Sequence, residues 1–216
     1  MYSTRQRIFQ FWDSELIPKE ITPLIETWMN LPGFDYRLFN SQTADDYIGK
    51  HFGARARGAY LQCGAPAMQA DFFRYCALYH EGGVYIDADT ENGGGLAELI
   101  TDAARGMVMN RQTKIANDFL YFRAPADPLL REVIDKAISN IEARISNNVW
   151  LVTGPGIMTQ MYQDIEQRPK FDGLAVRDVK IVREVVCFRN DLDYKISDND
   201  WRRHLDDASR TIFKDI

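Results

Sequence analysis

Apolar positions along the chain repeat with the two spacings of regular secondary structure, and the two spacings alternate. Apolar residues at every third or fourth position predict helices from Thr22-Pro23 to Met29, over Thr43–Phe52 with Thr43 as the cap, over Pro66–His80, over 128–146, and from Gly154 to about Gln167. Short β-branched and aromatic runs predict strands at Arg7–Trp12, Asp35–Phe39, Val84–Asp87, Gly106–Asn110, Phe119–Arg123 and Val179–Phe188. This alternation is typical of an α/β fold around a mostly parallel sheet, in which ligands bind beyond the carboxyl ends of the strands.

The clearest helical stripe lies in 128–146. It consists of Leu130, Val133, Ile134, Ala137, Ile138, Ile141 and Ile145. No internal repeat, low-complexity tract or long linker interrupts the 216 residues, which are enough to bury one sizeable core. We therefore expect residues 1–216 to form a single domain.

Charge and cysteine usage narrow the class of protein. The chain has 26 Lys+Arg and 31 Asp+Glu, a formal net charge of −5, so it lacks the basic balance of a nucleic-acid-binding protein. No run approaches the ~20 apolar residues of a membrane span, which leaves peripheral association as the expected kind of membrane contact. The N-terminal segment has no signal-peptide pattern, and Cys63, Cys76 and Cys187 have no C-x-x-C spacing. These features favour a cytoplasmic protein with buried, free thiols.

The helix over Pro66–His80 is apolar nearly all round, which predicts that it is buried. The charges within its body are Asp71 and Arg74, three residues apart and so neighbours on one face. Buried charges are costly unless they are paired or bound to a ligand. Two interpretations stay open: an internal pair that orients the helix, or a pair in the wall of a site that binds a polar ligand.

A second pair of charges, Asp87 and Asp89, follows the apolar strand at 84–87. With a strand period of two, both carboxylates are expected to point the same way. They would repel each other unless a cation lies beside them, and oxygen ligands without nearby His or Cys suit Mg²⁺, Mn²⁺ or Ca²⁺. A solvated acidic turn is the alternative for a D-x-D taken by itself.

Two metal sites are compatible with these carboxylates. Asp87, Asp89, Glu91 and Glu98 match positions 1, 3, 5 and 12 of a calcium-binding loop. That loop requires glycine at position 6, where this chain has Asn92, and a helix before it, where this chain has a predicted strand. We therefore favour a D-x-D that holds a divalent cation against a diphosphate.

Taken together, the segment Asp71-x-x-Arg74-x-x-x-Leu78-x-x-x-Gly82-Gly83-x-Tyr85-x-Asp87-x-Asp89 resembles the sugar-binding region of glycosyltransferase family 32. That family includes yeast initiating mannosyltransferases, bacterial capsule and lipopolysaccharide sugar transferases, and relatives of glucosylating clostridial toxins. Weaker similarity extends the resemblance over about residues 7–159. It implies a GT-A (Rossmann-like) fold, with a donor-binding core at about 7–125 and acceptor-side and closing elements at about 126–216.

The resemblance also implies a function and roles for particular residues. The function is transfer of a hexose, with retention, from a UDP- or GDP-sugar to a glycan, glycolipid or polysaccharide acceptor, with Mn²⁺ or Mg²⁺ as cofactor. Asp71 and Arg74 would bind the donor sugar, and Asp87 and Asp89 would bind the metal, with Asp87 also near the ribose. The other expected donor-binding residues are Tyr85, Asn117 and Trp12, the last as a stacking partner for the nucleobase or as a core residue.

The C-terminal part departs from the family pattern, which often has a His-Trp pair there. This chain has Asp200-Trp201 and His204 instead, and either Asp200 or His204 is a candidate for the metal shell. Two other functions stay open. One is a non-catalytic protein that binds divalent ions and sugar nucleotides. The other is a metal-dependent phosphohydrolase that uses the D-x-D, although Thr90 directly follows Asp89 instead of lying two residues beyond it.

Overall fold

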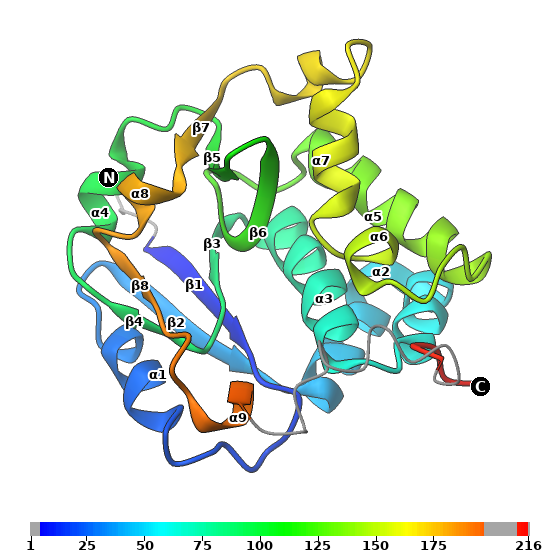
Figure 1. Cartoon of the computed structure of the whole chain (residues 1–216), viewed down its shortest axis with the longest axis horizontal. Helices are drawn as coiled ribbons and strands as arrows, with labels where there is room; N and C mark the ends of the chain where they lie inside the picture. Colours follow the sequence, from blue (N-terminus) through cyan, green and yellow to red (C-terminus); the bar gives the residue numbers. More distant parts are fainter. Residues whose placement is uncertain (1–4, 197–210, 216) are drawn as a thin grey trace.

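The computed structural model describes residues 5–196 and 211–215 of the chain (Figure 1). A six-stranded sheet lies at its centre, in the order β2-β1-β3-β6-β5-β7. The strands are β1 (Gln6–Phe11), β2 (Phe34–Phe39), β3 (Gly83–Ile86), β5 (Gly106–Arg111), β6 (Lys114–Phe122) and β7 (Leu174–Asp178). β6 runs antiparallel to both of its neighbours, whereas the other pairings are parallel. The expected mostly parallel sheet is therefore confirmed.

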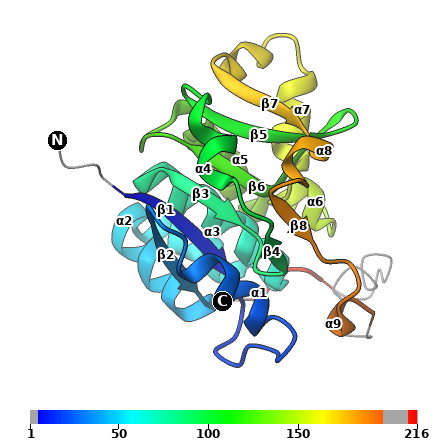
Figure 2. The same cartoon turned by 90° about the vertical axis from the view of Figure 1, so that its left-hand side faces the viewer.

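Helices cover both faces of the sheet, and a separate antiparallel ribbon joins β4 (Thr90–Asn92) to β8 (Val186–Phe188). On one face lie α2 (Ser41–Gln62), α3 (Pro66–Glu81), α5 (Pro128–Glu142), α6 (Val149–Val152) and α7 (Gly156–Gln163). On the other face, toward the viewer in Figure 2, lie α1 (Thr22–Met29), α4 (Leu96–Thr101) and α8 (Val179–Val182). The shorter elements η1 (Arg168–Phe171) and α9 (Asp193–Ile196) complete the described part.

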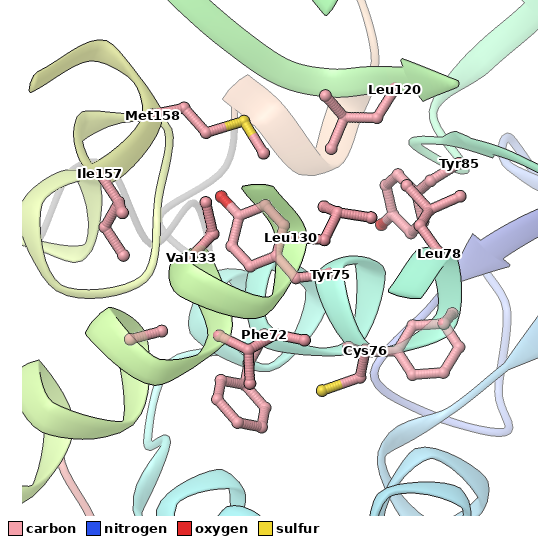
Figure 3. Packing of buried hydrophobic residues seen from close by; sticks show 14 of the residues in the cluster. Phe72, Tyr75, Cys76, Leu78, Tyr85, Leu120, Leu130, Val133, Ile157 and Met158 are labelled. Atoms are coloured by element: carbon pink, nitrogen blue, oxygen red, sulfur yellow. The ribbon is translucent and has the colours of Figure 1, made fainter. Parts of the chain in front are cut away.

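The strands divide their side chains between two cores, as a period of two requires. Phe9 and Phe11 of β1 belong to the cluster on the α3 side, whereas Ile8 belongs to the cluster on the α1 side. In Figure 3, Tyr75 of α3 lies among side chains of the first cluster, with Leu130 of α5 close by. Helix α3 is thus buried between the sheet and other helices, which explains why its sequence is apolar on almost every side.

Two glycines allow α3 to pass directly into β3. Gly82 and Gly83 have φ values of +66° and +101°, which favour glycine. A Cβ atom on Gly83 would lie 2.7 Å from the carbonyl oxygen of Arg7, on the adjacent strand β1. The glycine pair therefore lets β3 lie close against β1, and this sets the position of the residues that follow β3.

The helix predicted over Thr43–Phe52 is longer and begins earlier. It is capped by Asn40, whose side chain accepts from the Thr43 amide while the Thr43 hydroxyl accepts from the Asn40 amide. Gly53 has non-helical angles, as the predicted end near this residue implies, but a further helical stretch continues to Gln62. The sequence prediction missed this stretch because two glycines lie at its start and within it, and its apolar residues before Tyr60 are alanines.

Predictions for the C-terminal half were less accurate. The strand expected at 179–188 is wrong: residues 179–182 form α8, and only Val186–Phe188 form a strand. The helix predicted to reach 146 ends at Glu142, and Ile145 is 53% exposed instead of buried. The helix expected to reach Gln167 ends at Gln163. Short elements such as β7 and α6 were missed because they contain too few residues to show a period.

Within the described part of the chain, no helix is both long enough and apolar enough to cross a membrane.

Candidate active site

A pocket of about 530 Å³ lies beyond the carboxyl ends of β1 and β3, where an α/β sheet is expected to bind ligands. Seven of the residues singled out from the sequence line it: Trp12, Asp71, Arg74, Tyr85, Asp87, Asp89 and Asn117. They come from the end of β1, the buried helix α3, the region of β3 and the first half of β6. The fold therefore brings together residues that lie more than 100 positions apart in sequence.

Arg74 is the centre of the polar network in this pocket. Its Nη2 atom lies 3.2 Å from Asp71 Oδ1 and 3.1 Å from Asp87 Oδ1. Nη1 donates to the carbonyl oxygen of Asn117 at 2.5 Å, and the guanidinium carbon lies 4.3 Å from the centre of the Tyr85 ring. Burial lowers the pKa of Arg74, but the charges of Asp87, Tyr85 and Asp71 together raise it by more. The net shift is therefore upward, and the side chain stays charged.

Asp71 is almost completely buried, with 5% of the residue exposed. Oδ1 accepts from the side-chain amide of Asn117 at 2.8 Å, and Oδ2 accepts from the Thr153 hydroxyl at 3.3 Å. Burial raises the pKa of Asp71, while Arg74 and these hydrogen bonds oppose the rise. Asp71 and Arg74 thus form the internal pair of the first interpretation, and both also line the pocket, where ligand binding, the second interpretation, stays a prediction.

The two aspartates of the D-x-D lie in a turn and not on the strand itself, because β3 ends at Ile86. The expectation that strand alternation points both carboxylates one way is therefore wrong in its reason, although both line the pocket. The amide of Asp87 donates to the carbonyl of Asp118 at 3.0 Å, and the Thr90 hydroxyl donates to the carbonyl of Asp87 at 2.7 Å. The first bond holds the turn against β6, and the second closes the turn itself.

Three other carboxylates act on Asp87, besides the positive charge of Arg74. Burial in the pocket wall raises the pKa of Asp87 to about 7; Arg74 opposes the rise, and Asp89, Asp118 and Asp71 add to it. The pKa of Asp118 is also raised, by burial first, with Arg111 opposing. This accumulation of carboxylates is the electrostatic condition under which a divalent cation binds.

Asp118 is a pocket residue that the sequence analysis missed. It follows Asn117 on β6, forms an ion pair with Arg111, and leaves its Oδ1 atom buried without a hydrogen-bond partner among the described residues. Asn117 itself donates to Asp71 and to the Tyr75 hydroxyl, both at 2.8 Å. A signal was present in the sequence, since this aspartate lies between the candidate site residue Asn117 and the strand predicted from Phe119.

Asp89 contacts the C-terminal helix α9, which nothing in the local sequence predicts. The Tyr194 hydroxyl donates to Asp89 Oδ2 at 2.5 Å, and the Lys195 ammonium forms an ion pair with the same oxygen. The Tyr194 ring also meets the Trp12 ring edge-on, with 5.4 Å between centres. Trp12 is half-buried at this edge of the pocket, so it is not one of the fully buried core residues.

The carboxylates in this pocket fit a hard divalent cation that takes its remaining ligands from water and from the substrate. Among residues 5–196 and 211–215, no three His, Cys, Asp or Glu side chains form a ready-made metal cage. Mg²⁺ and similar ions instead commonly use one or two carboxylates and complete their shell with water and phosphate oxygens. Asp87 and Asp89 provide two such carboxylates, and the unpartnered oxygen of Asp118 adds negative charge nearby. Asp200, Trp201 and His204 lie outside the described residues.

Comparison with known proteins agrees with this geometry. Residues 18–104 match the family described as the glycosyltransferase sugar-binding region containing the DXD motif. That range includes Asp71, Arg74, Asp87 and Asp89 and stops before Asn117 and Asp118. Residues 18–104 are therefore similar to the sugar-binding region of this glycosyltransferase family, within the α/β fold described above.

Two particular proteins resemble the chain. The initiation-specific alpha-1,6-mannosyltransferase of Schizosaccharomyces pombe is 24% identical over 186 residues, covering 71% of this chain. The match covers 47% of that relative, so the chain spans about half of its length. Among solved structures, the PaToxG glycosyltransferase aligns with a TM-score of 0.58 and 21% identity, over 74% of this chain and 69% of the other. That likeness concerns the fold.

Proposed function

We propose that the protein transfers a hexose from a UDP- or GDP-sugar to a glycan or glycolipid acceptor, with Mn²⁺ or Mg²⁺ bound at Asp87 and Asp89. The observation that carries this proposal is the junction at Arg74, whose Nη2 atom joins Asp71 and Asp87 in a pocket lined by all seven candidate residues. The match of residues 18–104 to a DXD-containing sugar-binding region supports it.

The roles proposed for Asp71 and Arg74 follow from their remaining bonding capacity. A carboxylate has about four lone-pair positions, and Asp71 uses three of them on Asn117, Arg74 and Thr153. One position is left to accept a bond from a donor-sugar hydroxyl. Arg74 directs all three of its nitrogens at protein oxygens, so we assign it chiefly the positioning of Asp71 and Asp87.

At the DXD turn, Asp87 and Asp89 would hold the cation, which offsets the negative charge that develops on the departing diphosphate. Trp12, half-buried at the pocket edge, would stack on the nucleobase. Tyr85, whose ring packs against the Arg74 guanidinium, would help to position the donor. Because these carboxylates are committed to the cation and to Arg74, none is free to form a covalent sugar intermediate. On the basis of the family resemblance we propose retention by a front-face route: the acceptor oxygen bonds to the anomeric carbon as the bond from that carbon to the diphosphate breaks, and a phosphate oxygen of the leaving group accepts the proton of the acceptor hydroxyl.

The acceptor side is assigned to the second half of the chain, about residues 126–216, opposite the donor core at 7–125. Val149, Trp150 and Pro155 provide the part of the pocket wall that comes from this half, besides Tyr194. Cys63, Cys76 and Cys187 are free thiols, which supports a reducing, cytoplasmic location. Polysaccharide biosynthesis is the process we propose on the basis of the family resemblance.

The test is a screen of UDP- and GDP-sugars for hydrolysis without an acceptor, with and without Mn²⁺. We expect one donor to be cleaved slowly and only with the metal. Asp89→Asn should abolish cleavage, whereas Asp135→Asn, the same chemical change at an exposed site on α5, should not. Absence of metal-dependent binding or cleavage across all donors would contradict the proposal. Binding without turnover would favour a sugar-nucleotide-binding protein, and release of free phosphate from sugar phosphates would favour a phosphohydrolase.

A further inference from the structure

Asp89, the second aspartate of the DXD motif, already has a positively charged partner within the protein. The ammonium of Lys195 on α9 forms an ion pair with Asp89 Oδ2, and the Tyr194 hydroxyl donates to the same oxygen at 2.5 Å. The contact is well shielded, since 12% of the Lys195 side chain and 18% of the Asp89 side chain are exposed. Lys195 also donates to the carbonyl oxygen of Arg189, which fixes the ammonium further.

A second set of contacts holds α9 at the edge of the pocket. The carboxylate of Glu20 accepts from the amide of Asp193 at 2.7 Å and from the amide of Tyr194 at 3.0 Å. The Tyr194 ring lies edge-on against Trp12. The helix is therefore attached on one side to the loop before α1 and on the other side to Asp89.

A divalent cation and this ammonium compete for the same carboxylate. Oδ2 of Asp89 already accepts two bonds, which is the usual capacity of one carboxylate oxygen. Two cations at one carboxylate also repel each other strongly where protein shields them from water. A metal that binds Asp89 must either displace the ammonium or bind far more weakly than it would without it.

We propose that Lys195 is a built-in counterion of Asp89, which a divalent cation has to displace, so that metal binding is linked to release of α9 from the pocket edge. This inference rests on the proposed metal site at Asp87 and Asp89. It implies that the metal alone binds weakly, because part of its binding free energy is spent on breaking the Lys195 contact. A nucleoside diphosphate that adds phosphate ligands to the metal makes displacement favourable, so metal and donor bind cooperatively.

The test is a titration of the donor-free protein with Mn²⁺, followed by calorimetry and by electron paramagnetic resonance of the free ion. Lys195→Met removes the charge while keeping most of the side-chain volume, and it should raise the Mn²⁺ affinity about tenfold or more. Lys195→Arg keeps the charge and should bind Mn²⁺ like the unmodified protein. Lys170→Met makes the same change in net charge at η1, where the lysine pairs with Glu132, and should leave the affinity unchanged.

Two further measurements keep the test independent of how well one variant folds. Tyr194→Phe removes only the hydroxyl donor to Asp89 and should raise the Mn²⁺ affinity by a smaller factor. Hydrogen exchange of the Asp193 and Tyr194 amides, which Glu20 protects, should become faster in the unmodified protein when Mn²⁺ is added.

Equal or weaker Mn²⁺ binding by Lys195→Met would overturn the inference. If Mn²⁺ binds the unmodified protein, is lost in Asp89→Asn and is unaffected by Lys195→Met, the counterion role fails and the proposed metal site stands. If Mn²⁺ binds none of the proteins, with or without UDP or GDP, the metal site and the counterion role fail together.

Discussion

Nη2 of Arg74 lies 3.1 Å from Oδ1 of Asp87, and this contact joins the buried helix α3 to the first aspartate of the DXD turn. The same nitrogen lies 3.2 Å from Asp71. One guanidinium therefore holds two carboxylates from different elements inside the protein. Because a buried carboxylate is costly without a partner, the stability of the fold and the shape of the pocket depend on the same residue.

We predict that Arg74→Met lowers the free energy of unfolding by about 3–5 kcal/mol, because it leaves Asp71 and Asp87 without their cation. Urea denaturation followed by circular dichroism measures this change. Arg131→Met provides the matched control, since Arg131 pairs with Asp135 on the exposed face of α5 and its loss should cost about 0.5 kcal/mol or less. Similar losses for the two variants would contradict the role assigned to Arg74.

A second prediction concerns pH. Burial raises the pKa of Asp87 from 3.8 to about 7, so between these values the folded protein holds a proton that the unfolded chain has released. The free energy of unfolding contributed by this group therefore decreases as pH rises from 3.8 to about 7. Urea denaturation at pH 5 and pH 8 without metal should show a larger decrease in the unmodified protein than in Asp87→Asn. Equal decreases would contradict the prediction.

Metal binding should show the opposite pH dependence. A carboxylate must lose its proton before it can bind a cation, so Mn²⁺ affinity should increase as pH rises through about 7. Proton release on binding can be measured by calorimetry in buffers with different ionisation enthalpies. Constant affinity between pH 6 and pH 8 would indicate that Asp87 does not bind the metal.

The amide of Asn117 should couple Asp71 to Tyr75. Its side chain donates to both, so Asn117→Ala is expected to destabilise the protein by about 1–3 kcal/mol, since Asp71 loses a buried donor. Tyr75→Phe removes one end of this contact. The two single variants and the double variant form a cycle, in which additive losses would show that the contact contributes nothing.

Trp12 should contribute to nucleotide affinity. If its ring stacks on the base, Trp12→Ala should weaken UDP or GDP binding in the presence of Mn²⁺ by a free energy of about 1–3 kcal/mol, measured by calorimetry. Trp150→Ala changes another aromatic wall of the pocket, on the proposed acceptor side, and should leave nucleotide affinity unchanged. Equal weakening by both variants would argue against stacking at Trp12.

Much of the donor-side half of the fold could be predicted from the sequence. The turn between α3 and β3 needs two glycines with positive φ, and the motif spacing places Asp71 and Arg74 on the helix before the turn and Asp87 directly after the strand that follows it. Because these residues are close in sequence, a local motif is enough to predict that they lie near one another. The motif therefore identified residues that line one pocket, even though strand alternation was the wrong reason for the common direction of Asp87 and Asp89.

The rest of the site depends on contacts that no local pattern encodes. Asp118 meets Asp87 because β6 pairs with β3, and Lys195 meets Asp89 across 106 positions of the chain. In α9, four residues are too few to show a helical period. The segment 179–188 is apolar and β-branched enough to favour a strand, yet its first part forms α8 because it packs against β5 and β7.

The antiparallel pairing of β6 with β3 has a consequence for how this protein can be altered. Because the two strands run in opposite directions, β6 begins at the edge where β3 ends, and the Asp87 amide bonds to the Asp118 carbonyl there. The pocket is thus assembled from several stretches of chain, and residues 18–104 contain the DXD turn but not the β6 residues Asn117 and Asp118. A chimera that exchanges 18–104 with a relative would combine the DXD turn of one protein with the β6 wall of another, so exchanges meant to change donor preference should include residues up to 118.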